Sequence, residues 1–400
     1  MSAPATPGER SAAAIGQHVQ PACRTFWGKG AIGALPRELD RAGVRRAVVF
    51  CGASLAREGA LLARVESALG PRLAARFEGV REHAPVPAVV AGASALRAAG
   101  ADAVVAVGGG SAVVCARAAS ILFAEGRELR ALCTHRGADG RLVSPRLDAH
   151  KLPQFVVATT PSTAIAKAGS AVRDLDRNER LALYDPKTRA QALFLDPSAA
   201  VTAPVAVVEG AALNALSMAV EALGSAVDDP LADAALRQAL VLLARWLPRL
   251  RTPDDAAARV PLMLAALLAG QGTDHKHGGL AGSLGHALGP RAAVSNGHVE
   301  AIVLPHAVRF NAPATGARMA AAAASLGGDS RADADAPART ADALERLLAA
   351  LPAPRRLRDA GVPHEALEAA VRHALDDWFL QHNPQPVGPA ALRTLLEAAW

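Results

Sequence analysis

The sequence contains few aromatic residues and no basic run interleaved with them. Aromatic residues make up 3% of the 400 residues, and the basic residues behind the net charge of +6 are scattered among 37 acidic ones. Proteins that bind nucleic acid usually combine a continuous basic surface with aromatic side chains that stack on bases. The composition therefore argues against nucleic acid as a partner.

Cysteine is equally sparse, and no two cysteines form a CxxC pair. The four that occur are widely spaced, at Cys23, Cys51, Cys115 and Cys133. This spacing predicts neither a disulfide framework nor a thiolate zinc site. We expect all four to be small buried residues.

Uninterrupted apolar runs and a signal peptide are also missing. The stretches AVVAVGGGSAVVCA and ALRQALVLLARWL are interrupted by glycine and by arginine, respectively, and MSAPATPGERSAAAIG lacks a charged segment followed by an apolar one. Neither a membrane span nor an export signal is predicted. We expect a cytoplasmic protein that does not bind membranes, with a flexible tail over residues 1–21.

What the sequence does contain is two different patterns. Hydrophobic residues reach 51%, which is enough to form a large core. Over residues 22–200, short β-branched runs such as RRAVVFC, ADAVVAVGG and QFVVATT alternate with helical stretches, which is typical of a parallel α/β sheet. Over residues 201–400, long alanine- and leucine-rich helical segments follow one another. The predicted fold class is α/β plus all-α, with an N-terminal parallel-sheet domain and a C-terminal helical domain.

A run of glycines follows one predicted strand and precedes a predicted helix. In VVAVGGGSAVVCARAAS, these residues are Gly108, Gly109, Gly110 and Ser111. Backbone N–H groups and the helix dipole at such a turn can bind a pyrophosphate. The spacing is not GxGxxG, and a tight turn that only needs positive φ remains the alternative.

Several motifs occur in a fixed order along the chain. They are FWGKGAIGALPREL, GGGS, ATTPST, FLDPS, NALSMAVEALGS, LGHALG, AIVLPHAVRFNAP and the late NPQPV. In this order they resemble the iron-containing alcohol dehydrogenase family, whose fold is like that of dehydroquinate synthase, and within it the branch similar to maleylacetate reductase. The resemblance implies a dinucleotide-binding domain, a helical domain, an active site between them, and a homodimer that acts on a small molecule with NADPH or NADH.

The same resemblance implies which residues hold the cofactor. Gly108 to Ser111 would bind the pyrophosphate, and Thr159, Thr160 and Thr163 would line the ribose and nicotinamide. Gly52 stands where alcohol dehydrogenases of the family often carry an acidic residue at the end of the second strand. An acidic side chain there repels a 2′-phosphate, so its absence permits NADP.

The resemblance also locates four metal-ligand positions, and none of them carries a usual ligand. They are occupied by Asn214, Met218, Gly282 and Asn296. Two amides, a thioether and a missing side chain do not supply the anionic and imidazole ligands that Fe²⁺ or Zn²⁺ needs. We therefore expect no metal at this site.

Without a metal, a reductase needs another group to stabilise or protonate the carbonyl oxygen. The stretch HKHGGLAGSLGH contains three histidines near the expected site, and the candidates are His286, His275, His277 and His298. The resemblance places His286 beside the substrate. On a helix, His275 and His277 point about 200° apart and cannot chelate one ion, although a rearranged metal site among the four candidates remains an alternative. Other histidines, His18 among them, show no readable pattern.

The function that follows is a metal-independent NAD(P)H-dependent reductase of a small polar carbonyl or enone compound, with a histidine as proton donor. A lyase, isomerase or cyclase that uses the same histidines without net redox chemistry is the first alternative. A catalytically silent homologue is the second. Retention of the glycine turn favours the reductase, although such a turn also serves the fold.

Overall fold

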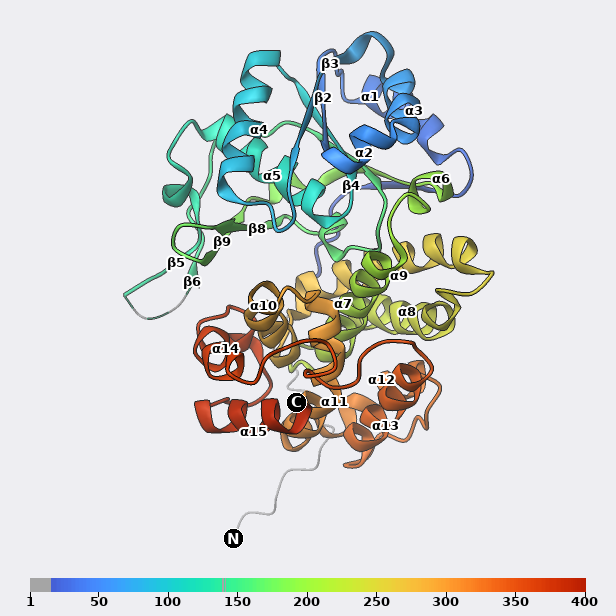
Figure 1. Ribbon diagram of the computed structural model, residues 1–400, viewed down its shortest axis with the longest axis vertical. Coiled ribbons are helices and arrows are strands. Elements are labelled where there is room, and N and C mark those ends of the chain that lie inside the picture. Colours follow the sequence, from blue (N-terminus) through green and yellow to red (C-terminus); the bar gives the residue numbers. More distant parts are fainter. Residues whose placement is uncertain (1–15, 139, 141) are drawn as a thin grey trace.

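The computed structural model describes residues 16–138, 140 and 142–400. It separates a sheet-containing half from a helical half, which lie one above the other in Figure 1. Most of the tail predicted over residues 1–21 falls in residues 1–15, outside the described residues. The remainder, residues 16–21, forms neither helix nor strand.

The N-terminal half is built on one parallel sheet of six strands. Their order across the sheet is β1-β10-β7-β4-β2-β3, with every neighbouring pair parallel. In chain order the strands are β1 (Arg24–Trp27), β2 (Ala47–Gly52), β3 (Leu73–Val80), β4 (Ala103–Gly108), β7 (Gln154–Ala158) and β10 (Ala190–Leu195). The central strands are nearly all apolar because helices cover both of their faces. This confirms the parallel α/β fold predicted for this half.

Helices pack on both sides of this sheet. One face packs against α1 (Leu35–Arg41) and α3 (Ala60–Leu69), and the other against α4 (Val86–Ala99) and α5 (Gly110–Glu125). Two short helices, α2 (Ala53–Glu58) and α6 (Pro197–Ala200), follow strands β2 and β10.

Two antiparallel hairpins interrupt the α/β pattern. They are formed by β5 (His135–Arg136) with β6 (Leu142–Val143), and by β8 (Gly169–Asp174) with β9 (Glu179–Tyr184). Both lie on the same side of Figure 1, away from α1 and α3. The β8–β9 hairpin matters for the site described below.

The C-terminal half is helical, as predicted, and shares one hydrophobic core. Its helices are α7 (Val205–Gly224), α8 (Pro230–Trp246), α9 (Asp255–Lys276), α10 (Leu280–Ala292), α11 (Asn296–Thr315), α12 (Ala320–Ser325), α13 (Ala336–Ala349), α14 (Ala366–Leu375) and α15 (Pro389–Ala399). Of the helices in the described part of the chain, α7 alone has the length and apolar composition to cross a membrane, and 67% of its apolar window is buried inside the protein. Core helices of this kind give the same signal.

All four cysteines are free thiols, and three of them are buried as predicted. The prediction is wrong for Cys23, which is exposed. It directly precedes β1, the strand at one edge of the sheet, where no further strand covers it.

Candidate functional site

The glycine turn lies between the end of β4 and the start of α5. Gly108 adopts a φ of +146°, which favours glycine. A Cβ on Gly109 would lie 2.9 Å from Thr160 Oγ1, and a Cβ on Gly110 would lie 2.6 Å from Ser162 Oγ. The Thr159 N–H also donates to the Gly108 carbonyl at 3.0 Å. The turn is therefore packed against the loop after β7, with backbone in place of side chains where a ligand could approach.

The structure thus brings together the residues predicted to hold the cofactor. Gly108 to Ser111 follow β4, whereas Thr159, Thr160 and Thr163 follow its neighbour β7 and are buried. Gly52 ends β2, on the other side of β4. From β2 the chain continues to β3 in one direction, and from β4 it continues to β7 in the other. Ligands of open parallel sheets bind at such a switch point, beyond the carboxyl ends of the strands.

Three of the four positions that hold the metal ligands in the family resemblance are occupied by other contacts. Asn214 Nδ2 donates to both carboxylate oxygens of Glu300, at 2.9 and 2.7 Å. The Thr163 hydroxyl donates to Met218 Sδ at 3.6 Å. A side chain on Gly282 would lie 2.6 Å from the ring of Phe379. The Asn296 side-chain oxygen, at the start of α11, is buried and hydrogen bonds to no described residue.

These contacts do not fit a bound Fe²⁺ or Zn²⁺. The Asn214 amide is engaged by a carboxylate, and an aromatic ring fills the space beside Gly282. A group of possible metal ligands does occur in the described part of the chain, but at a different place. It consists of His18, Asp229 and His275, whose ligand atoms lie within 4.8 Å of one another. We derive no chemical step through a metal at the four substituted positions.

His286 lies in α10, where the two halves of the protein meet. Its Nδ1 is 2.8 Å from Asp377 Oδ2, and both side chains are only 8% exposed. Phe379 packs beside the imidazole, with ring centroids 4.9 Å apart. A ring that donates from Nδ1 to a buried carboxylate is fixed in orientation, and its Nε2 remains available for proton transfer.

Arg180 reaches this pair from the β8–β9 hairpin of the α/β domain. Its guanidinium stacks 4.3 Å from the ring centre of Trp378 and lies 3.5 Å from Asp377. Burial and the nearby Arg180 lower the pKa of His286, against the opposing effect of Asp377. His286 therefore responds to charges from both domains.

The other three candidate histidines lie in separate environments. Each contacts a different partner: His275 stacks on His18, His277 stacks on His382, and His298 Nε2 lies 3.3 Å from Glu209. Burial lowers the pKa of His277 to about 4. The structure therefore does not bring the four histidines together. Of the four, only His286 pairs with a carboxylate that an arginine of the α/β domain also contacts, because Arg180 lies beside its partner Asp377.

Comparisons with known proteins agree with this arrangement. Residues 22–197 match the family model "Iron-containing alcohol dehydrogenase", and residues 210–400 match "Fe-containing alcohol dehydrogenase family, C-terminal". Maleylacetate reductase 1 of Cupriavidus pinatubonensis is 30% identical over 380 residues, covering 94% of this chain and 95% of that protein. The chain belongs to the iron-containing alcohol dehydrogenase family.

Two further relatives are similar over nearly the whole chain. Lactaldehyde reductase of Escherichia coli is 28% identical, covering 94% of this chain and 98% of that protein. The structure of sulfoacetaldehyde reductase from Bifidobacterium kashiwanohense in complex with NAD⁺ superposes with a TM-score of 0.82 at 20% identity, covering 96% and 99% of the two chains. The chain is accordingly an NAD(P)-dependent oxidoreductase of the iron-containing alcohol dehydrogenase family.

In this member of the family, the site is surrounded by buried and partly buried charged groups, which the sequence did not reveal. They are Lys167, Arg180, Glu221, Glu300 and Asp377. Burial lowers the pKa of Lys167 to about 8, and burial raises the pKa of Glu300 to about 8. Arg180 occurs in the polar stretch RDLDRNER, where nothing distinguishes it from exposed arginines.

Glu221 holds the start of α10 in place. Its carboxylate accepts from the backbone N–H groups of Gly279, Ala281 and Gly282, at 3.1, 2.6 and 3.2 Å. These groups have no partner within the helix, so a carboxylate stabilises this helix terminus. Because His286 lies in the second turn of α10, Glu221 also helps to position the imidazole.

Replacing Glu300 by glutamine should make stability less dependent on pH. The buried Glu300 carboxyl keeps its proton up to a pKa of about 8, whereas in the unfolded chain it ionises near pH 4.3. The folded state therefore binds more protons between these values, and wild-type stability falls as pH rises through this range. Relative to wild type, we expect Glu300→Gln to gain about 3–4 kcal/mol on going from pH 5 to pH 8.

Urea unfolding at pH 5 and pH 8 measures this difference. Glu58→Gln is the matched control, because Glu58 is exposed and should leave the pH dependence unchanged. An unchanged pH dependence in Glu300→Gln would show that Glu300 is ionised in the folded protein at neutral pH.

Proposed function

We propose that this protein reduces a small polar carbonyl or enone compound with NADPH or NADH, without a metal at the reacting carbon, and that His286 donates the proton. The observation that carries the proposal is the buried pair of His286 and Asp377. It provides a proton donor at the interface with the cofactor-binding domain. The four substituted metal positions provide no Lewis acid there.

Gly108 to Ser111 would hold the pyrophosphate of a reduced dinucleotide and Thr159, Thr160 and Thr163 its nicotinamide side, and this cofactor would supply a hydride to the electrophilic carbon. His286, as the imidazolium, gives its Nε2 proton to the carbonyl oxygen and becomes neutral. Asp377 keeps the ring in position and stabilises the imidazolium form, because its carboxylate raises the pKa of His286. His286 regains its proton from solvent after the product alcohol leaves. In the reverse direction, the neutral ring accepts the proton of the alcohol.

The substrate that we propose carries a carboxylate. The Arg180 side chain is 29% exposed, but its Nη1 atom is buried and hydrogen bonds to no residue that the structure describes. A guanidinium of this kind can bind a carboxylate through two parallel hydrogen bonds. Maleylacetate, named for one relative, has such groups and is the first compound to test.

The cofactor should contact Gly108 to Ser111, Thr159, Thr160 and Thr163, with Gly52 beside the adenosine ribose. The open space at Gly52, where a Cβ would meet only the Val80 carbonyl at 3.7 Å, is compatible with NADPH as well as NADH. We also propose a cytoplasmic homodimer, as expected from the sequence.

The test begins with chelator-treated, metal-analysed protein. We expect calorimetric titration to show micromolar binding of NADPH or NADH, and carboxylate-bearing carbonyl compounds to be reduced with one NAD(P)H oxidised per turnover while the chelator is present. The metal-independent mechanism would be refuted if turnover is lost in chelator and Fe²⁺ or Zn²⁺ restores it both in wild type and in His18→Ala. Turnover without NAD(P)H consumption would favour a lyase, isomerase or cyclase, and binding of neither nucleotide would refute the reductase.

A further inference from the structure

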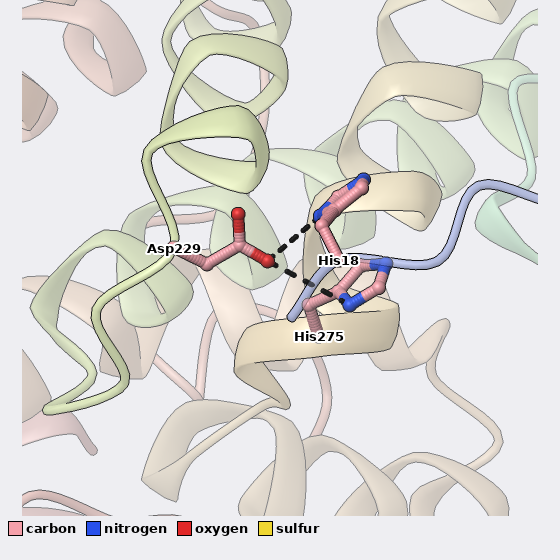
Figure 2. A group of neighbouring side chains, drawn as sticks. All are labelled: His18, Asp229 and His275. Carbon is pink, nitrogen blue, oxygen red and sulfur yellow. Dashed lines mark hydrogen bonds and ion pairs between the residues drawn. The ribbon is translucent and has the colours of Figure 1, made fainter. Parts of the chain in front are cut away.

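Two histidines and an aspartate meet at a place unrelated to the substituted metal positions. His18 Nδ1 lies 2.8 Å from Asp229 Oδ2, and His275 Nδ1 lies 3.7 Å from the same oxygen. Figure 2 shows both imidazoles directed at this carboxylate. The two rings are stacked, with centroids 3.9 Å apart and planes inclined by 22°.

The three side chains come from segments that are far apart in sequence. His18 belongs to the segment before β1, Asp229 precedes α8, and His275 lies in the last turn of α9. Asp229 Oδ1 accepts from the backbone N–H groups of Leu231 and Ala232, at 3.1 and 3.0 Å, and so caps α8. This cap fixes the carboxylate and turns its second oxygen toward the imidazoles.

A direct hydrogen bond explains only part of this arrangement. At 2.8 Å, His18 hydrogen bonds to Asp229, but 3.7 Å is too long for His275 to do so. Two imidazole nitrogens and one carboxylate oxygen are a common ligand set for divalent transition metals. In a tetrahedral zinc site with bonds of about 2.0–2.1 Å, neighbouring ligand atoms lie about 3.3 Å apart. The two distances here fall on either side of that value.

We propose that His18, Asp229 and His275 bind one divalent transition-metal ion, with Zn²⁺ as the reference ion. The side chains of His18 and His275 are 19% and 21% exposed, so water can complete the coordination. The nearby Lys276 ammonium is paired with Asp233 at 2.6 Å, which limits its repulsion of a cation. The bound ion ties the segment before β1 to the ends of two helices of the helical domain.

This ion has a structural role and takes no part in the proposed reduction. None of its three ligands is a residue to which we assign proton transfer or cofactor binding. The inference therefore leaves unchanged the expectation that the four substituted positions bind no metal. It is independent of the proposed function.

The experiment uses the full chain, stripped with a chelator and titrated with Zn²⁺ by calorimetry and with Co²⁺ by visible absorption. We expect one ion per chain, a Co²⁺ spectrum with nitrogen and oxygen ligands, and a higher Tm with Zn²⁺. His18→Ala and His275→Ala should each weaken binding by about 100-fold or more. Asp229→Asn should also weaken binding while preserving the helix cap, because asparagine caps as well as aspartate.

His364→Ala is the matched control, since His364 is exposed and contacts a carboxylate, Glu397, without a second histidine. It should bind Zn²⁺ like wild type. Wild-type Zn²⁺ affinity in both His18→Ala and His275→Ala, or absence of stoichiometric binding at micromolar Zn²⁺, would overturn the proposal. Loss of the ion in His286→Ala but not in His18→Ala would also overturn it and place the metal at the interface of the two domains. Reductase turnover in chelator tests the proposed function separately.

Discussion

A His286→Ala variant should lose reductase turnover by about 10²- to 10⁴-fold, the usual contribution of a positioned general acid. The loss should appear in kcat, because the residues proposed to bind NAD(P)H lie in the other domain, so that its affinity should change little. Steady-state kinetics in the presence of chelator, together with a nucleotide titration, measure both quantities. His373→Ala is the matched control, since His373 is exposed on α14 and should leave turnover unchanged.

The pH dependence of the same reaction tests the role of Asp377. Reduction needs the imidazolium, so kcat/KM for reduction should fall as pH rises through the pKa of His286, which burial holds below its usual value. Because Asp377 raises this pKa, Asp377→Asn should move the falling limb of the profile to lower pH. A purely structural role would lower the rate without moving the limb. For the first prediction, undiminished turnover in His286→Ala would show that His286 is not the proton donor.

A Gly52→Asp variant should discriminate against NADPH. Gly52 ends β2 with ordinary extended backbone, at φ −86° and ψ 156°, so an aspartate fits without strain. A carboxylate there would accept from the ribose hydroxyls of NADH and repel the 2′-phosphate of NADPH. We expect the ratio of NADPH to NADH affinity to fall about 10- to 100-fold, as one or two charge contacts would cause.

Calorimetric titration of both nucleotides gives this ratio directly. Gly388→Asp is the control, because it adds the same charge at an open position that caps α15, where aspartate is favoured. If Gly52→Asp binds both nucleotides as wild type does, the adenosine ribose lies away from the end of β2. Such a result would contradict the placement of the cofactor at the switch point of the sheet.

Local patterns account for what the sequence predicted correctly. Strands β2, β4 and β7 are short apolar runs because they are buried on both faces, and such runs are visible in the sequence. The glycine turn after β4 was likewise visible, since glycines between a strand and a helix form a local signal.

Contacts between distant segments could not be predicted in the same way. His286 and Asp377 are 91 residues apart, and Arg180 reaches them from the other domain. A charged residue that is buried against a distant partner looks, in its own stretch of sequence, like a residue on the surface. His18 showed no signal for the same reason, because its two partners lie in α9 and just before α8.

The β8–β9 hairpin has a thermodynamic consequence for the enzyme. Arg180 of this hairpin pairs with Asp377, the group that orients His286, so separation of the two domains breaks an ion pair that the imidazole depends on. By linkage, a ligand that favours contact between the domains also favours the oriented imidazole of His286. A ligand that draws Arg180 away from Asp377 weakens both the domain contact and the orientation of the imidazole. In the proposed mechanism, contact between the domains and alignment of the proton donor are therefore coupled, and the substrate carboxylate competes with Asp377 for a single guanidinium.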